Sequence, residues 1–375
     1  MYPRKLISLI EDELKKPEII LLFGARRTGK STLLNLLNER YPEMEIFNCD
    51  NPLVYDVLQS KKTEAIKALF KRGDLIAFDE AQTVPDIGLI LKLLFDDSSS
   101  HTKFIATGSS SFDLANKTGE PLTGRNVSFN LFPLSLSEIK EKTGSLKVME
   151  KLNDYLVYGT YPGIVDMNNN DKIKRLIQLS SDYLFKDILK FERLKNPDLL
   201  RQLLKALALQ TGSQVSVQEL SQLLKISALT VERYLELLQK SFIIYKLSSY
   251  SSNLRNEIKK SKKYYFYDNG IRNALINNFN PVDNRTDAGA LWENFCVIET
   301  LKKVEYEQRF SNLYFWRTYD GAEIDLIEER NGEIFTYEFK WNPRRKAKIP
   351  KSFAEKYKVK HFKVVTPENI FYEFI

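Results

Sequence analysis

Short apolar runs alternate with helical stretches along the first third of the chain. Strands that alternate with helices in this way are joined by crossovers and pair in parallel. The pattern therefore predicts an α/β domain with a parallel sheet, ending near residue 145, where Pro133 and a polar run interrupt it. The four runs expected to be strands are Glu18–Phe23, Glu45–Cys49, Leu75–Phe78 and Lys103–Thr107.

The middle third has a helical pattern followed by strand-like residues. Apolar residues recur at helical spacing from Leu152 to Leu209. The next segment, Val215–Leu247, predicts a short helix, a turn at Ile226 and Ser227, a second helix and a β-rich end, which is the order of a winged helix-turn-helix. We therefore expect a helical and winged-helix connector over residues 146–276, and a polar linker after it.

The last hundred residues predict an antiparallel hairpin within an α/β domain. Two strand-like runs, Ala322–Glu329 and Glu333–Trp341, flank Asn331-Gly332, a dipeptide that favours a two-residue turn. Such a turn places Asp325 opposite Glu338, with Cβ atoms about 5 Å apart. The expected domains are therefore residues 1–145, 146–276 and 277–375.

Composition excludes several classes of protein. Of the 375 residues, 43% are hydrophobic and 28% are charged, as in globular chains. No run approaches the roughly 20 apolar residues of a membrane-spanning helix, and charges interrupt the first apolar run before a signal peptide can form. Cys49 and Cys296 are too few for a disulfide framework or a thiolate zinc site. We expect a cytoplasmic protein without membrane contact.

Positive charge is concentrated near the carboxyl end. Residues 340–363 contain ten Lys or Arg and one acid, Glu355, whereas the whole chain has a net charge of +7. Such a segment fits a surface that contacts phosphates, so nucleic acid is an expected partner. A solvated lysine-rich face is the alternative.

The clearest chemical motif follows the first apolar run. The string GARRTGKS matches G-x-x-x-x-G-K-[ST] and lies between a strand-like run and a helical run. In such a loop, backbone N–H groups surround phosphate oxygens, the lysine reaches the β and γ phosphates, and the final hydroxyl binds magnesium. The predicted contacts with ATP and Mg²⁺ are Gly24, Ala25, Arg26, Arg27, Thr28, Gly29, Lys30, Ser31 and Thr32.

An acidic pair supplies the second part of this predicted site. Asp79 and Glu80 follow the apolar run Leu75–Phe78. Asp79 is placed to hold the magnesium shell, and Glu80 to orient or deprotonate the attacking water. The next expected strand ends in Gly108 and three serines, of which Ser109 is a candidate contact for the γ-phosphate, with a helix cap as the alternative.

The order of these motifs resembles a known family. GARRTGKSTLL, LIAFDEAQTVPDI, FIATGSSS and PLTGRNVSFNLFPLSLSEI look like the AAA-type P-loop ATPases of archaea and bacteria that carry an uncharacterised C-terminal domain. The resemblance continues through ISALTVERYLELLQKSFIIYKL, KKYYFYDNGIRNAL, GALWENF, GAEIDLI and YEFKW, so it covers most of the chain. It implies ATP hydrolysis and makes Arg125, in LTGR, a candidate arginine finger acting in cis or in trans. A structural salt bridge is the alternative.

The hairpin carries a second candidate site. Two opposed carboxylates repel unless positive charge lies between them, so Asp325 and Glu338 are candidate ligands of Mg²⁺ or Mn²⁺. Asp followed by Glu-x-Lys on adjoining strands resembles the metal-dependent restriction-endonuclease-like nucleases, with Ile324 in place of a frequent Pro. The resemblance implies that Lys340 stabilises charge developing on phosphate. A salt bridge between Glu323 and Lys340 is the alternative.

Three functions remain open from the sequence. The leading one is an ATPase that controls a C-terminal effector acting on nucleic acid. The second is an ATP-dependent switch or scaffold for protein partners or for further copies of the chain, with an inactive nuclease fold. The third is a DNA-binding regulator, although the expected second helix, Ala228–Lys240, has no net charge to attract a phosphate-lined groove. Glu293 matches an extra acid of some nucleases, but we expect it on the exposed surface.

Overall fold

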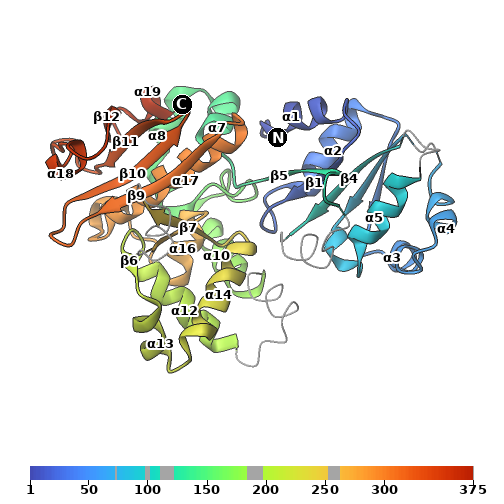
Figure 1. Ribbon diagram of the computed structural model, residues 1–375, viewed down its shortest axis with the longest axis horizontal. Helices are drawn as coiled ribbons and strands as arrows, with labels where there is room; N and C mark the ends of the chain where they lie inside the picture. Colours follow the sequence, from blue (N-terminus) through green and yellow to red (C-terminus); the bar gives the residue numbers. More distant parts are fainter. Residues whose placement is uncertain (72–73, 98–101, 110–121, 184–196, 252–261, 375) are drawn as a thin grey trace. The chain divides into compact units, whose positions relative to one another are not determined.

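The computed structural model describes residues 1–71, 74–97, 102–109, 122–183, 197–251 and 262–374 (Figure 1). The chain forms two compact units. The smaller unit comprises residues 3–132 and 240–242, and the larger unit comprises residues 1–2, 133–239 and 243–375. None of the described helices is long and apolar enough to cross a membrane.

The smaller unit contains a five-stranded parallel sheet in the order β2-β3-β4-β1-β5, with helices around it (Figure 1). The expectation of an α/β domain with a parallel sheet is confirmed, because all four apolar runs are strands. The fifth strand was missed because it is polar and only partly buried. The strands are β1 (Ile19–Phe23), β2 (Met44–Asn48), β3 (Leu75–Asp79), β4 (Lys103–Gly108) and β5 (Asn126–Asn130); the helices are α1 (Leu6–Glu13), α2 (Lys30–Arg40), α3 (Pro52–Gln59), α4 (Thr63–Lys67) and α5 (Ile87–Asp96), with a 3₁₀ turn at Ala81–Thr83.

The strand order decides which loops meet. Strand β4 lies between β1 and β3, with Ile105 paired to Ile20 on one side and to Ala77 on the other. Because the strands are parallel, the loops that follow β1, β3 and β4 leave from the same edge of the sheet. The predicted phosphate loop (residues 24–31), the acidic pair Asp79-Glu80 and Ser109 therefore gather at one edge.

The larger unit begins with helices and includes the expected helix-turn-helix segment. Helices α13 and α14 share a core that includes Leu204, Leu220 and Leu238. The turn between them ends at Ser227, whose hydroxyl accepts the N–H of Thr230 at 3.1 Å. The winged-helix interpretation of this segment stays a prediction. The helices are α7 (Leu136–Thr143), α8 (Ser145–Glu150), α9 (Leu152–Tyr158), α10 (Asn169–Gln178), α12 (Pro197–Leu209), α13 (Val217–Leu224) and α14 (Ala228–Lys240), with a π turn at Leu179–Tyr183.

A seven-stranded mixed sheet joins the middle and C-terminal parts of the chain. Its order is β12-β11-β10-β9-β7-β8-β6, and the join is the parallel pairing of Ser248 with Tyr314 and of Ser249 with Phe315. The strands are β6 (Gln214–Val215), β7 (Ile244–Ser249), β8 (Lys262–Phe266), β9 (Ser311–Arg317), β10 (Glu323–Arg330), β11 (Glu333–Phe339) and β12 (Val359–Val365); the remaining helices are α16 (Asn269–Leu275), α17 (Ala288–Tyr306), α18 (Lys351–Ala354) and α19 (Ile370–Phe374), with a 3₁₀ turn at Val282–Asn284.

The polar segment that was expected to be a linker is packed within the larger unit. Arg285 is buried, contacts Asp287 at 2.8 Å and donates to the carbonyl oxygen of Asn278 at 2.7 Å. Arg272, also buried, contacts the same Asp287 at 2.5 Å. Burial raises the pKa of Asp287, but the hydrogen bonds from the two guanidinium groups outweigh it and lower the pKa to about 2. Part of the polar composition of this segment therefore serves an ion pair between the buried Arg285 and the half-buried Asp287.

Asp268 is a buried carboxyl group that caps α16. One oxygen accepts the N–H of Thr160 at 2.7 Å and the other accepts the N–H of Ile271 at 3.2 Å. Burial raises the pKa of Asp268 from 3.8 to about 6, although these hydrogen bonds and Lys302 act to lower it. The folded larger unit therefore binds this proton more tightly than the unfolded chain does.

We expect the carboxyl group of Asp268 to make the larger unit less stable as the pH rises from about 4 to 6. The stabilisation is complete below the unfolded pKa of 3.8 and is lost as the pH passes the folded pKa of about 6. All three tryptophans lie in the larger unit, so their fluorescence in urea measures its unfolding. Asp268→Asn should flatten the slope between these pH values, whereas Asp283→Asn, at an exposed carboxyl group, should leave it unchanged. An unaltered slope in Asp268→Asn would contradict the assignment.

Candidate functional site

The phosphate loop connects β1 to α2 in a conformation that depends on two glycines. Gly29 has a φ of 101°, in the left-handed region that favours glycine, and directly precedes Lys30. At Gly24, an added Cβ atom would lie 2.3 Å from the carbonyl oxygen of Leu131, so only hydrogen fits there. Gly29, the residue before α2, has no side chain with which to cap the helix, as an anion-binding helix N-terminus requires.

Lys30 is folded back onto the loop. Its Nζ donates to the carbonyl oxygens of Gly24 at 2.9 Å and Ala25 at 3.2 Å, and the residue is 4% exposed. Thr28 is fully buried and its hydroxyl donates to the carbonyl of Ala25 at 2.8 Å, so its side chain supports the loop from inside. Three other predicted contacts, Arg27, Ser31 and Thr32, are exposed, and Arg26 is half-buried.

The acidic pair at the end of β3 is held by a residue of β4. Asp79 accepts a hydrogen bond from the hydroxyl of Thr107 at 2.5 Å, and the N–H of Glu80 donates to the same hydroxyl at 3.1 Å. The carboxyl group of Glu80 accepts from Gln82 Nε2 at 2.5 Å. Glu80 has a φ of 53°, an uncommon backbone conformation for a residue with a side chain. Thr107 and Gln82 therefore orient both acids.

Sequence reasoning missed Thr107 and Gln82. Gln82 also accepts the N–H of Ser109 at 3.3 Å, and the buried hydroxyl of Ser109 has no hydrogen-bond partner within the described residues. The serines at 110 and 111 lie outside those residues. A polar residue inside a buried strand was the available signal for Thr107, because such a side chain needs a hydrogen-bond partner.

Arg125 lies at the edge of the sheet opposite the phosphate loop. It precedes β5, and its carbonyl oxygen accepts the N–H of Ile19, the first residue of β1. A strand rises about 3.3 Å per residue, so Arg125 is about 13 Å along β1 from Phe23, the residue before the loop. Its Nε contacts Asp96 at 2.7 Å. This geometry does not fit contact with the nucleotide of the same domain; contact with a neighbouring copy stays a prediction.

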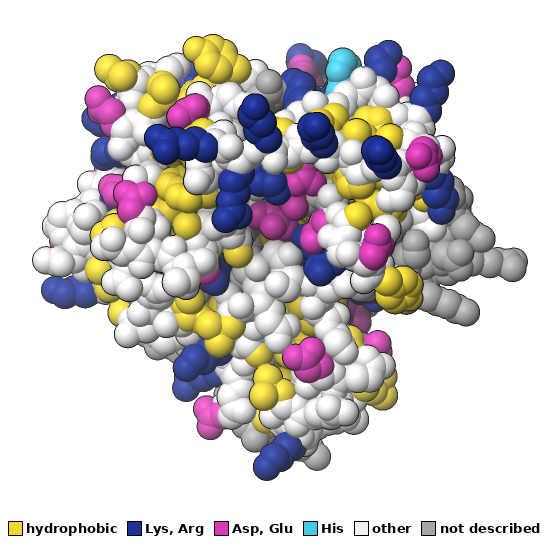
Figure 2. Space-filling model, turned by 90° about the vertical axis from the view of Figure 1, so that its left-hand side faces the viewer, with side chains coloured by type: hydrophobic (Ala, Val, Ile, Leu, Met, Phe, Trp, Pro, Cys, Tyr) yellow, Lys and Arg dark blue, Asp and Glu magenta, His cyan; other side chains and the backbone are white. Residues whose placement is uncertain are grey.

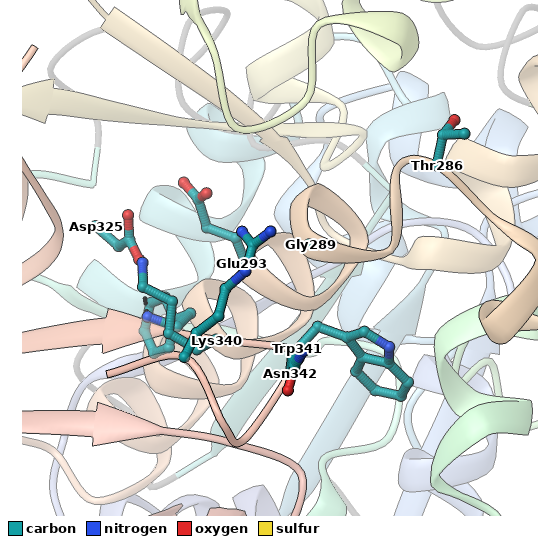
Figure 3. Close-up of a pocket in the computed structure, with 9 residues that line it drawn as sticks. Thr286, Gly289, Glu293, Asp325, Lys340, Trp341 and Asn342 are labelled. Atoms are coloured by element: carbon teal, nitrogen blue, oxygen red, sulfur yellow. Dashed lines mark hydrogen bonds and ion pairs between the residues drawn. The ribbon is translucent and has the colours of Figure 1, made fainter. Parts of the chain in front are cut away.

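The larger unit contains a polar pocket of about 400 Å³ beside α17, β10 and the end of β11 (Figure 3). Figure 3 shows Glu293 of α17 and Asp325 of β10 directed toward the same space as the ammonium group of Lys340. Both acidic and basic side chains therefore line it. Residues that line the pocket include Glu293, Asp325, Lys340, Trp341, Asn342 and Arg345.

The β10–β11 hairpin has the predicted register, with Leu326 paired to Tyr337. Lys340 Nζ contacts Glu338 at 2.6 Å and Asp325 at 3.4 Å, so the positive charge between these carboxylates is the lysine itself. Burial raises the pKa of Glu338 to about 7; the charge of Asp325 adds to this effect and Lys340 opposes it. The alternative salt bridge between Glu323 and Lys340 is wrong, because Glu323 contacts Lys263 at 2.5 Å.

The expectation that Glu293 lies on the exposed surface is also wrong. Its carboxyl group accepts hydrogen bonds from Lys263 Nζ at 2.9 Å and from the hydroxyl of Tyr265 at 2.7 Å. Burial raises the pKa of Glu293 to about 7, and Lys263 opposes this rise. Helix α17 buries residues on all its sides, so it has no apolar stripe from which an exposed face can be inferred.

A lysine, and not a cluster of metal ligands, lies between the hairpin carboxylates at this pocket. The described residues contain no group of three or more His, Cys, Asp or Glu side chains arranged to hold a metal ion. Because Lys340 contacts both Asp325 and Glu338, a divalent cation between them would have to displace its ammonium group. Their role as metal ligands stays a prediction.

The basic segment begins at Lys340, which lines the pocket, and continues along the chain after β11. Residues 341–350 run without regular structure between β11 and α18, and Arg344, Arg345, Lys346 and Lys348 are exposed. Figure 2 shows Lys and Arg side chains spread across the upper part of one face of the molecule, with Asp and Glu side chains between them near its centre.

Family models match three successive parts of the chain. The model described as an AAA domain matches residues 16–140. Two domains of unknown function, DUF8612 and DUF4143, match residues 149–282 and 288–374.

Individual proteins are similar over most of the chain. An uncharacterized protein of Mycobacterium tuberculosis is 28% identical over 329 residues, which cover 87% of this chain and 71% of that protein. An uncharacterized protein of Haemophilus influenzae is 26% identical over 338 residues, which cover 84% and 80%. The Walker-type ATPase of Pyrococcus abyssi has a similar fold, with a TM-score of 0.53 and 20% identity over 74% of this chain and 96% of that one.

Proposed function

We propose that this protein binds and hydrolyses ATP and uses the reaction to control its larger unit, because residues 16–140 match the model of an AAA domain and the fold is similar to that of a Walker-type ATPase. The observation that carries the proposal is the convergence of three side chains at one edge of the sheet. Lys30 follows β1, and Asp79 and Glu80 end β3, with β4 between the two strands.

In this proposal each group has one role. The backbone N–H groups of the loop bind the phosphates, and Lys30 exchanges its carbonyl contacts for contacts with the β and γ phosphates. Ser31 and Asp79 would hold magnesium, which when bound neutralises charge on the phosphates. Glu80 orients the attacking water and accepts its proton, while Thr107 keeps both acids in place.

Nucleotide binding is the direct test. Lys30→Ala removes charge-assisted hydrogen bonds worth about 1.5–3 kcal/mol, so we expect ATP affinity to fall by roughly 10- to 100-fold. Calorimetry with a slowly hydrolysed ATP analogue and magnesium measures this change. Lys15→Ala, at an exposed lysine of the same unit, is the matched control and should bind like wild type. Equal affinities for all three proteins would contradict a nucleotide site at Lys30.

A second part of the proposal is that the larger unit acts on nucleic acid. The observation that favours it is the exposed basic loop, residues 341–350, at the rim of the pocket that contains Glu293 and Asp325. A basic rim attracts a phosphodiester backbone, and carboxylates behind it can bind a divalent cation. The alternatives are a scaffold for protein partners without nuclease activity and DNA binding through α14.

We expect binding of nucleic acid to weaken steeply with salt, because each phosphate contact releases a counterion. Neutralising Arg344, Arg345 and Lys346 together should reduce the slope of log affinity against log salt by about 2–3 for double-stranded DNA, at roughly 0.9 per lost contact. Fluorescence anisotropy with single- and double-stranded oligonucleotides measures the slope. Neutralising Lys147, Lys151 and Lys174 changes the net charge equally elsewhere in the larger unit and should leave the slope unchanged. Equal slopes for the two triple variants would move the binding surface away from this loop.

The same oligonucleotides and a supercoiled plasmid, incubated with magnesium or manganese, distinguish the alternatives. Cleavage that is lost in Asp325→Ala and Glu338→Ala, with ATP hydrolysis intact, supports a nuclease-like effector. Binding without cleavage supports a DNA-binding regulator. Absence of binding at low salt leaves the scaffold.

A further inference from the structure

Arg4 is a buried cation that contacts two distant backbone segments of the smaller unit. The residue is 7% exposed, and one guanidinium nitrogen, Nη1, donates to the carbonyl oxygen of Thr28 at 2.6 Å. The other, Nη2, donates to the carbonyl oxygen of Phe132 at 2.7 Å. Thr28 belongs to the phosphate loop, and Phe132 is the last residue of the smaller unit before the chain enters the larger one. One side chain therefore links the nucleotide site to the unit boundary.

The geometry of this link is restrictive. A Cβ atom on Gly29 would lie 3.4 Å from Arg4 Nη1, so the guanidinium group packs against the loop where α2 begins. A guanidinium group is planar, rigid and always charged, so its two hydrogen bonds set the spacing of the two carbonyl groups. Movement of the loop at Thr28 must therefore move Phe132 or break one of the bonds.

The segment before Phe132 also contacts the other end of the loop. Leu131 donates its N–H to the carbonyl oxygen of Phe23 at 2.7 Å, and its own carbonyl oxygen lies where a side chain at Gly24 would be. The phosphate loop is thus bordered at its first glycine by Leu131, and at its second, through Arg4, by Phe132. A change in the conformation of the loop at either glycine would therefore displace Leu131 or Phe132.

Beyond the boundary, the chain is held by buried groups of the larger unit. The carbonyl oxygen of Leu134 accepts a hydrogen bond from Lys302 Nζ at 3.0 Å, and the N–H of Leu136 donates to Glu299 at 2.8 Å. Lys302 and Glu299 belong to α17, the helix that also carries Glu293. Tyr2, which comes two residues before Arg4 in the sequence, also belongs to the larger unit. Its hydroxyl donates to Asp166 at 2.7 Å.

We infer that Arg4 is a positioning residue that transmits the nucleotide state of the phosphate loop, through Phe132, to the segment Pro133–Leu136 and α17. The inference rests on the proposed binding of ATP. Bound phosphate orders the loop, strengthens the bond from Arg4 to Thr28 and restrains Phe132. The backbone amides of Leu134 and Leu136 then open less often.

Hydrogen exchange on the full chain tests this coupling. With a saturating ATP analogue and magnesium, exchange of the Leu134 and Leu136 amides in wild type should slow by about tenfold, a typical coupling between linked sites. Arg4→Lys keeps the charge but cannot donate to both carbonyls from two fixed nitrogens, so it should still bind nucleotide while this slowing disappears. Arg40→Lys makes the same substitution at an exposed arginine of the same unit and should behave like wild type.

Calorimetry on the same samples separates the possible failures. If wild type binds the analogue but exchange at Leu134 and Leu136 does not change, the coupling is refuted and ATP binding stands. If Arg4→Lys binds the analogue and retains the slowing, Arg4 is only a structural contact. If wild type binds no nucleotide, the proposed function fails and the coupling fails with it. The wild-type measurement decides the question even if Arg4→Lys does not fold.

Discussion

ATP turnover by Glu80→Gln is expected to fall by a factor of about 10² to 10⁴, with little change in affinity for ATP. The substitution keeps the size of the side chain and the capacity to bond with Gln82, which is 2.5 Å from Glu80 in the wild type. It removes the group that accepts a proton from the attacking water. The backbone of Glu80, held by the hydroxyl of Thr107, does not depend on the side chain. Steady-state phosphate release measures turnover, and calorimetry measures binding.

Two comparisons make this result specific. Glu39→Gln, at an exposed carboxylate of α2 in the same unit, should turn over ATP like wild type. Lys30→Ala should bind ATP more weakly, whereas Glu80→Gln should lose catalysis with binding retained. Turnover by Glu80→Gln equal to that of wild type would exclude Glu80 as the group that activates water. The group that activates water would then have to be sought among other residues at the same edge of the sheet.

The second large effect concerns the stability of the larger unit. Lys302 is 2% exposed, contacts Glu299 at 2.7 Å and donates to the carbonyl oxygen of Leu134 at 3.0 Å. Lys302→Ala leaves the carboxylate of Glu299 buried without its ion-pair partner, so we expect a loss of about 3–5 kcal/mol in the free energy of unfolding. Urea unfolding followed by tryptophan fluorescence measures this loss, because every tryptophan lies in the larger unit.

A matched substitution and a double variant complete this experiment. Lys174→Ala, at an exposed lysine of the same unit, should change stability by less than about 0.5 kcal/mol. The double variant Lys302→Met with Glu299→Gln should cost less than the sum of its two single changes, because no buried charge is left alone. If Lys302→Ala is as stable as Lys174→Ala, the pair does not hold the segment that follows Phe132 in place.

Local patterns were sufficient for the position and backbone of the loop at residues 24–31 and for the strand that precedes it. The apolar run that became β1, and the glycines at 24 and 29, act through backbone preferences that depend on a few neighbouring residues. The β10–β11 register was predictable for the same reason. A two-residue turn at Asn331-Gly332 determines which residues pair, so Leu326 lies opposite Tyr337.

Local patterns failed where residues far apart in the chain meet. Arg125 is part of a motif of the resembled family, but the parallel pairing of β5 with β1 places it at the edge away from the loop of its own domain, and its contact with a neighbouring copy stays a prediction. Glu293 was assigned to the surface because its helix was assumed to have an exposed face. Glu293 instead accepts hydrogen bonds from Lys263 and Tyr265 of β8. The spacing of apolar residues along a helix cannot indicate such partners from another element.

By itself, the sequence determined short-range features of this protein: the apolar strands of the first sheet, the backbone of the glycine-rich loop at residues 24–31, and the register of the hairpin. Each depends on backbone geometry or on burial within one element, and these leave a periodic or compositional signal. The tertiary structure alone decided that β4 lies between β1 and β3, which brings Thr107 to Asp79. It also decided that Arg4 contacts both Thr28 and Phe132. Such contacts satisfy buried polar groups across long separations, and the choice of partner depends on the packing of the whole unit.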